Sequence, residues 1–126
     1  MIKRGEIVLL SFPFTDLQTT KVRPALVVSS DSFNKISRDA VFIFITSKPY
    51  NEPFDIRLDK QDTSFRTTRL KVSSTLRASK IMCLEQGLVK SHLGCLDNKT
   101  MQKVEQALMS LLSLNRNNRT SSHCVA

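Results

Sequence analysis

The chain has 126 residues, in which 19 lysines and arginines outnumber 11 aspartates and glutamates to give a formal charge of +8. A hydrophobic fraction of 40% and a charged fraction of 24% are typical of one globular domain, and they exclude collagen, coiled coil and global disorder. The longest uninterrupted apolar run, Ala40–Ile45, is far shorter than the ~18 residues that cross a bilayer. The first residues lack the apolar segment of a signal peptide, so we expect a cytoplasmic protein without a membrane partner.

Short apolar runs separated by polar turns predict about five or six strands. The predicted strands are Glu6–Phe12, Ala25–Val28, Ala40–Ile45 and Phe54–Leu58, followed by one or two extended segments within Lys71–Leu84. Ala40–Ile45 is apolar at every position, which indicates a central strand buried on both faces. We expect loops at Phe14–Val22 and Lys48–Pro53, an irregular segment at Gln61–Thr68, and a connector with room for one helical turn at Asp31–Ser37.

The only convincing helical pattern lies near the end of the chain, in Asp97–Leu114. Its apolar residues recur at helical spacing, and Asp97 or Asn98 can serve as the N-cap. The polar segment Asn115–Ala126 is expected to be disordered. The sequence therefore predicts one domain over residues 1–114, of the mainly β (α+β) class, with a small antiparallel barrel or roll closed by a C-terminal helix.

Positive charge is concentrated between Arg57 and Lys80. This segment has seven cations and two anions, so it contributes +5 of the total +8. Such a cluster attracts a polyanion, which could be RNA, DNA or an acidic protein, by screened Coulomb attraction and counterion release. A solvated basic face without a ligand has the same pattern.

Histidine, cysteine and glycine give few signs of chemistry. His92 and His123 are read as surface residues, and Cys83 and Cys95 as small core residues because they flank or lie in apolar segments. A metal site of His92, Cys95 and Cys83 is conceivable, but no pair of them has the spacing of a structural zinc site. Three cysteines without a CxxC pair do not form a disulfide framework. Three glycines leave no Gly-rich phosphate loop.

One pair of polar residues lies where two predicted strands meet a loop. Arg23 precedes Pro24 at the start of one strand, and Thr46 follows Ile45 at the end of another. If these strands are neighbours, a guanidinium and a hydroxyl meet at one rim of the barrel, an arrangement that suits phosphate. Taken singly, Arg23 is also explained by a surface ion pair and Thr46 by a turn.

The sequence resembles the MazF/PemK toxins over nearly its whole length. The motifs that carry the resemblance, in order and with preserved spacing, are Lys3–Val8, Arg23–Ser29, Asp31–Asn34, Ile45–Ser47 and Leu70–Ser74. The resemblance implies an SH3-like barrel that forms a homodimer, with contacts near Ile43 or on the C-terminal helix. It also implies a sequence-specific endoribonuclease that cleaves single-stranded RNA through 2′-OH attack without a metal or cofactor.

The resemblance also implies partners and site residues. A small acidic antitoxin would block the RNA groove, and DNA would be contacted only through the antitoxin complex. Arg23 and Thr46 match the family's catalytic arginine and threonine. The candidate RNA contacts are Phe14, Lys21, Ser47, Lys48, Tyr50, Arg66, Arg69, Arg77 and Lys80.

Three further points bear on these site residues. Arg77 falls where some PemK-like members have a functional arginine, but their accompanying acidic residue is matched by Ser79. The loop Phe14–Val22 is shorter than in many members and lacks their glutamate. Phe14 and Tyr50 could stack on an unpaired base, or each ring could simply cap the barrel core.

Two other functions remain open at this stage. The chain could be a catalytically silent barrel that binds nucleic acid or an acidic antitoxin in a regulatory role. It could also be a protein-interaction domain whose basic face meets an acidic partner.

Overall fold

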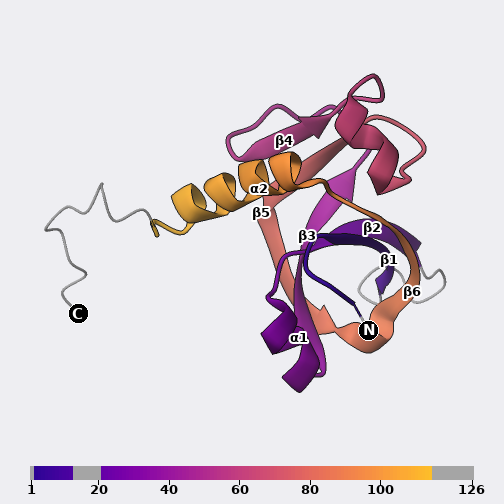
Figure 1. The fold of residues 1–126 in the computed structure, drawn as a ribbon, viewed down its shortest axis with the longest axis vertical. Helices are drawn as coiled ribbons and strands as arrows, with labels where there is room; N and C mark the ends of the chain where they lie inside the picture. The colour runs from indigo at the N-terminus through magenta and orange to yellow at the C-terminus, as the bar shows by residue number, and fades with distance from the viewer. Residues whose placement is uncertain (1, 13–20, 115–126) are drawn as a thin grey trace, which may run out of the picture.

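The computed structural model describes residues 2–12 and 21–114, which form an antiparallel sheet with flanking helices (Figure 1). The strands are β1 (Glu6–Phe12), β2 (Lys21–Val27), β3 (Asp39–Thr46), β4 (Asp55–Leu58), β5 (Ser74–Glu85) and β6 (Val89–Cys95). The helices are α1 (Asp31–Ile36) and α2 (Asn98–Leu111), with the short 3-10 helices η1 (Thr63–Thr68) and η2 (Gln86–Leu88). The predicted mainly β class with a C-terminal helix is confirmed.

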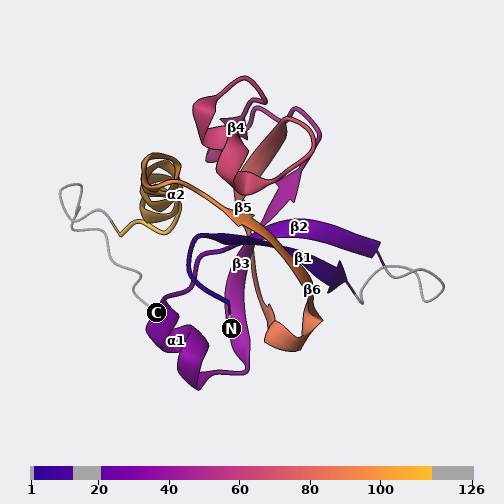
Figure 2. The same cartoon turned by 45° about the vertical axis from the view of Figure 1, so that its right-hand side comes forward.

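The described strands pair in the order β4-β5-β3-β2-β1-β6. Each pair is antiparallel, and the strand directions turn strongly from one edge to the other (Figure 2). β3 lies between β2 and β5, and its apolar side chains fill both faces of the sheet, with Phe42 and Ile43 each fully buried. The prediction of a central strand at Ala40–Ile45 is therefore confirmed.

Alternating side chains divide the core into two clusters. The helix-covered core consists of Ile7, Leu26, Ile43, Ile45, Leu58, Phe65, Leu76, Leu96, Met101 and Val104. The opposite core consists of Ile2, Val8, Leu10, Ala25, Val27, Ala40 and Phe42. Because α2 contributes Met101 and Val104 and η1 contributes Phe65, these two helices cover one face of the sheet.

Helix α2 begins at the cap that the sequence predicted. The Asp97 carboxylate accepts the Thr100 N–H at 2.9 Å and the Ser64 hydroxyl at 2.6 Å. These bonds, first the one from Ser64 and then those from Thr100, lower the pKa of Asp97 below its usual value. The cap thus also joins η1 to α2. Neither this helix nor any other in the described residues is long and apolar enough to cross a membrane.

Two strands differ from the prediction. β2 begins at Lys21 rather than Ala25, so Arg23 and Pro24 lie within the strand and not at the end of a loop. Pro24 is tolerated there because the β2–β3 pairing begins one residue later. Strand β6 was not predicted, since its residues are mostly half-buried or exposed and show no apolar alternation.

Strand β6 passes very close to η1. A Cβ atom added at Gly94 would lie 2.2 Å from the backbone oxygen of Thr67 and 2.8 Å from the carbonyl of Thr68. Only glycine permits this approach without a shift of the backbone. Gly94 therefore brings η1 and the outer edge of the sheet together.

One prediction about apolar residues was wrong. Cys83 and Cys95 are exposed rather than in the core, because Cys83 lies on the outer part of β5 and Cys95 at the end of an edge strand. Ile43 itself is fully buried within the subunit, and the predicted dimer contacts near it or on the C-terminal helix stay a prediction.

Candidate functional site

Four side chains form a row across the face of the sheet that α2 does not cover. Thr46 on β3 pairs with Thr75 on β5, which pairs with Arg57 on β4. Arg23 lies two residues before Ala25 on β2 and Thr46 two residues after Phe44 on β3, and Ala25–Phe44 is the last pair between these strands, so both residues belong to the same face of the sheet. Directly opposed residues in a sheet have Cβ atoms about 4.5–5.5 Å apart. The row Arg23, Thr46, Thr75, Arg57 therefore crosses β2, β3, β5 and β4.

Arg23 is the exposed end of this row. Its side chain makes no hydrogen bond or ion pair with another residue in the described part of the chain. Lys21 lies two residues earlier on β2, on the same face and also exposed. The arginine and threonine that the sequence paired thus lie on adjacent strands and on one face of the sheet, while their joint site and their catalytic role stay predictions.

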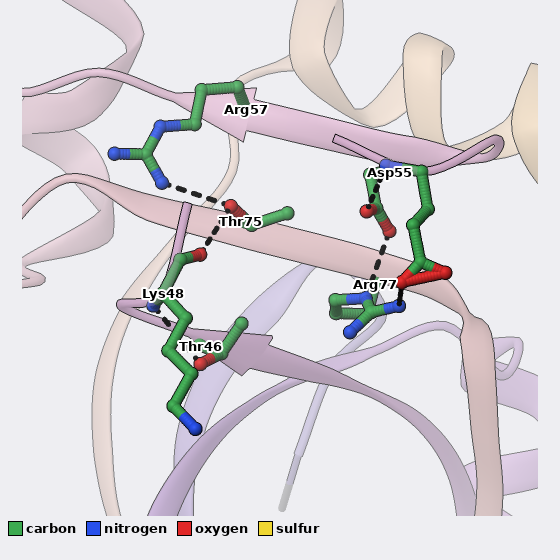
Figure 3. A network of polar contacts seen from close by, with 7 residues as sticks. Thr46, Lys48, Asp55, Arg57, Thr75 and Arg77 are labelled. Atoms are coloured by element: carbon green, nitrogen blue, oxygen red, sulfur yellow. Dashed lines mark hydrogen bonds and ion pairs between the residues drawn. The ribbon is translucent and has the colours of Figure 1, made fainter. Parts of the chain in front are cut away.

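The middle of the row is joined by hydrogen bonds (Figure 3). The Thr46 Oγ1 accepts the N–H of Lys48 at 3.2 Å. The Thr75 Oγ1 donates to the Lys48 carbonyl at 3.0 Å and accepts from Arg57 Nη1 at 3.0 Å. These bonds link the strand carrying Thr46 to the turn that follows it and to the edge strand β4.

Arg77 lies one row further along β5, and its charge is already paired. Its side chain is only 9% exposed, with Nε donating to Asp55 Oδ1 at 3.0 Å and Nη2 to Glu52 Oε1 at 3.1 Å. Its guanidinium also lies 3.9 Å from the centre of the Tyr50 ring. Figure 3 shows Arg77 and Asp55 pointing toward each other from neighbouring strands. A contact of Arg77 with RNA stays a prediction, and it would have to compete with two carboxylates.

The other predicted contacts are divided between two regions. Ser47, Lys48 and Tyr50 are exposed on the segment after β3, next to the row, and their contact with RNA stays a prediction. Arg66 and Arg69 are exposed at the end of η1, and η1 packs through Phe65 into the helix-covered core. The structure therefore does not bring these two arginines to the face that carries Arg23.

Two further predicted residues stand apart. Lys80 is exposed on β5, between the stretches of regular pairing that end at Arg77 and Ile81. Phe14 lies outside the described residues.

Sequence reasoning missed Arg57, Thr75, Asp55 and Glu52 as site residues. The first three belong to a pattern that was visible, since β4 has charged residues at Asp55 and Arg57 and β5 has polar residues at Thr75 and Arg77. Spacing by two places each pair on one face of its strand. Which face each pair occupies follows only from the pairing of β4 with β5.

The side chains that commonly ligate metals are not clustered in the described part of the chain. No group of three or more histidine, cysteine, aspartate or glutamate side chains suited to a metal ion occurs in residues 2–12 and 21–114. His92 is exposed, as predicted, and its Nδ1 is paired with the Glu6 carboxylate on β1. The groups that the row offers to a ligand are the guanidinium of Arg23 and the hydroxyl of Thr46, which together suit a phosphodiester.

Solved structures of toxins share this fold. An endoribonuclease in complex with its cognate antitoxin from a mycobacterial species matches with a TM-score of 0.74 and 22% identity, over 91% of this chain and 98% of that one. MazF from Deinococcus radiodurans matches with a TM-score of 0.70 and 24% identity, over 89% and 96% of the two chains. The Mycobacterium tuberculosis toxin MazF-mt6 matches with a TM-score of 0.71 and 13% identity, over 87% and 98%. At these identities the likeness establishes the fold.

The sequence itself gives the family. The model for PemK-like, MazF-like toxins of type II toxin–antitoxin systems matches residues 3–112, which include every strand of the sheet and the whole of α2. The residues of the row lie inside this match. The chain therefore belongs to the PemK-like, MazF-like toxin family of type II toxin–antitoxin systems.

Proposed function

We propose that this toxin is a metal-independent, sequence-specific endoribonuclease that cleaves single-stranded RNA by attack of the RNA's own 2′-OH. The observation that supports it is the position of Arg23, which is exposed and has no side-chain partner among the described residues, on the same face of the sheet as Thr46 on the adjacent strand. Two of the matched structures are named endoribonucleases, which favours the same chemistry.

The reaction needs little from the protein beyond positioning and charge. The 2′ oxygen gives its proton to water and forms a bond to phosphorus as the bond from phosphorus to the 5′ oxygen breaks, and the leaving 5′ oxygen takes a proton from water; negative charge grows on the non-bridging oxygens between these events. The planar fork of Arg23 matches two such oxygens. A guanidinium keeps its proton in proteins, so Arg23 stabilises charge rather than removing a proton.

Thr46 adds a hydrogen-bond donor beside this charge. Its Oγ1 already accepts the Lys48 N–H, which leaves its hydroxyl proton for the phosphate. One donor aimed at a developing oxyanion is worth about 2.7–4 kcal/mol, or roughly 10²- to 10³-fold in rate. We assign the larger share to Arg23 because a charged donor forms the stronger bond.

The test compares alanine variants of two exposed arginines, of which one lies on β2 and the other just before β3. Arg23→Ala should lower cleavage by about 10² or more. Arg38→Ala is the matched control, since Arg38 is exposed and precedes β3 at the end opposite Thr46. Equal loss in both variants would reduce Arg23 to general charge attraction, and unchanged cleavage in Arg23→Ala would remove it from the site.

The products and the substrate sugar test the nucleophile. In EDTA, the parent should give a 2′,3′-cyclic phosphate, or its hydrolysed 3′-phosphate, and a 5′-OH. Deoxyribose at the scissile nucleotide should block cleavage while leaving binding nearly intact. A 3′-OH product would contradict 2′-OH attack, and binding without any cleavage by the parent would favour a regulatory, catalytically silent barrel.

We also propose a small acidic antitoxin as partner and a homodimer as the toxin's state. The net charge of +8 supports an acidic partner, and the mycobacterial endoribonuclease was solved with its cognate antitoxin. The partner should suppress cleavage and bind more weakly as salt rises. Light scattering at micromolar concentration should give twice the mass of 14.3 kDa, and a monomeric mass would contradict the dimer.

A further inference from the structure

A buried threonine hydroxyl links Arg57 to the turn after β3. Thr75 is fully buried, and its Oγ1 lies 3.0 Å from Arg57 Nη1 and 3.0 Å from the Lys48 carbonyl oxygen. A guanidinium can only donate and a carbonyl can only accept. The direction of both bonds is therefore fixed, since Thr75 must give its one proton to Lys48 and accept from Arg57.

The same turn fixes the hydroxyl of Thr46. The Lys48 N–H donates to Thr46 Oγ1 at 3.2 Å, while the Lys48 carbonyl is held by Thr75 and also accepts the Tyr50 N–H at 2.9 Å. Lys48 is thus anchored on both sides of its Cα atom. The Thr46 oxygen accepts a hydrogen bond from Lys48, which leaves the hydroxyl proton to be donated. No described residue accepts that proton.

Arg57 strengthens this chain of bonds from the edge strand. Its Nε also pairs with Asp59 Oδ1 at 3.3 Å, and its side chain is 35% exposed. A charged donor polarises the hydroxyl that it binds, which strengthens the bond that this hydroxyl gives in turn. Arg57 therefore strengthens the bond from Thr75 to the Lys48 carbonyl, and the effect reaches Thr46 through the position of the Lys48 turn, since the Lys48 N–H belongs to the preceding peptide unit (Figure 3).

We infer that Thr75, supported by Arg57, is a positioning residue that holds the Lys48 turn so that Thr46 presents its hydroxyl proton to the scissile phosphate. The inference rests on the proposed ribonuclease function. It assigns Thr75 no contact with RNA, since its side chain is buried and both hydrogen-bonding roles of its hydroxyl are occupied. Its effect on the reaction passes through Thr46 alone.

The test is a double-mutant cycle. Thr75→Val keeps the branched shape but removes the hydroxyl, and it should lower kcat about tenfold with little change in KM. Thr75→Ser retains the hydroxyl and should keep most of the parent kcat. In a Thr46→Ala background, Thr75→Val should cause no further loss, because the residue through which it acts is gone.

A matched control separates the relay, meaning the hydrogen bonds from Arg57 through Thr75 to Lys48, from the ion pair between Arg57 and Asp59. Asp59→Asn removes the charge partner of Arg57 but leaves the bond to Thr75, so kcat should stay at the parent level. Arg57→Met removes the first link at a partly exposed position and should lower kcat about threefold. If Thr75→Val does not fold, the double-mutant cycle is measured with Arg57→Met and Thr46→Ala instead.

A second readout needs no RNA. Hydrogen exchange of the Lys48 amide should be about tenfold faster in Thr75→Val than in the parent and unchanged in Thr75→Ser. Unaltered exchange in Thr75→Val, or a full additional loss of kcat on top of Thr46→Ala, would overturn the inference. A parent that cleaves no RNA would instead overturn the proposed function, and the exchange experiment would still decide whether the relay exists.

Discussion

Replacing Asp55 with alanine should destabilise this protein far more than replacing any exposed carboxylate. The Asp55 side chain is 4% exposed and that of Arg77 is 9% exposed, with 3.0 Å between Oδ1 and Nε. Asp55 also accepts the Glu52 N–H through Oδ2 at 2.9 Å. The alanine variant therefore leaves a buried guanidinium without its main counter-charge and frees a backbone donor.

The magnitude follows from the burial of the pair. Breaking a buried ion pair by removing one partner costs about 3–5 kcal/mol, because the remaining charge stays desolvated. Glu52 also bonds Arg77, but its side chain is 58% exposed, so Glu52→Gln should cost about 0–1 kcal/mol. For a domain of this size, Asp55→Ala should lower Tm by about 10–20 °C and Glu52→Gln by a few degrees at most.

The assay is urea and thermal unfolding of the parent, both single variants and Asp55→Leu/Arg77→Met. The double variant removes both buried charges and should recover most or all of the parent's unfolding free energy. An Asp55→Ala loss as small as that of Glu52→Gln would refute the reasoning, because it would mean that water reaches the Arg77 guanidinium. Failure of the double variant to recover would mean that Asp55 acts through its bond to the loop instead.

Three further predictions concern stability and binding. Gly94→Ala should cost about 2 kcal/mol or more in urea unfolding because its Cβ would collide with backbone, whereas Gly87→Ala, with open space around its Cβ, should stay within about 1 kcal/mol of the parent. Asp97→Ala should lose about 1 kcal/mol at neutral pH. Since folding lowers the pKa of Asp97 below its ordinary value of 3.8, its contribution is present above that pH and is lost as pH falls through the folded value, so the gap to Asp97→Asn should close in acid unfolding curves. RNA affinity should fall steeply between about 50 and 200 mM salt, and a flat titration would contradict binding through phosphate contacts.

The central part of the fold could be predicted from sequence because burial leaves a direct mark there. β3 is apolar at almost every position since both of its faces pack into core, and this pattern needs no knowledge of its neighbours. Asp97 was recognised as a cap from its place before a helical repeat. Strand β6 left no such mark, because it is an edge strand whose hydrogen bonds to β1 are made by backbone atoms.

The sequence could suggest only those candidate site residues that can be recognised from the end of a single strand. Arg23 and Thr46 each lie at the end of an apolar run, so the sequence could place them on two neighbouring strands, while their joint site stays a prediction. The neutralisation of Arg77 was not visible, since its partner Asp55 is 22 residues away and the distance between them depends on register. The same limit applies to Thr75, whose polarity in a buried strand has meaning only beside the Lys48 carbonyl.

The pairing of β1 with β6 has a consequence for how the chain folds. Glu6 lies opposite Cys95, so one side of the first strand receives its hydrogen bonds from the last. The segment between β1 and β6 includes all the other strands, and a loop this long closes late in folding. Sheets dominated by distant pairings fold in milliseconds to seconds. During synthesis, the strands that carry Arg23, Thr46, Thr75 and Arg57 are complete when β5 has emerged, while β1 still presents a bare edge. A nascent chain halted before Val89 should therefore self-associate, and synthesis of the final strand removes that edge.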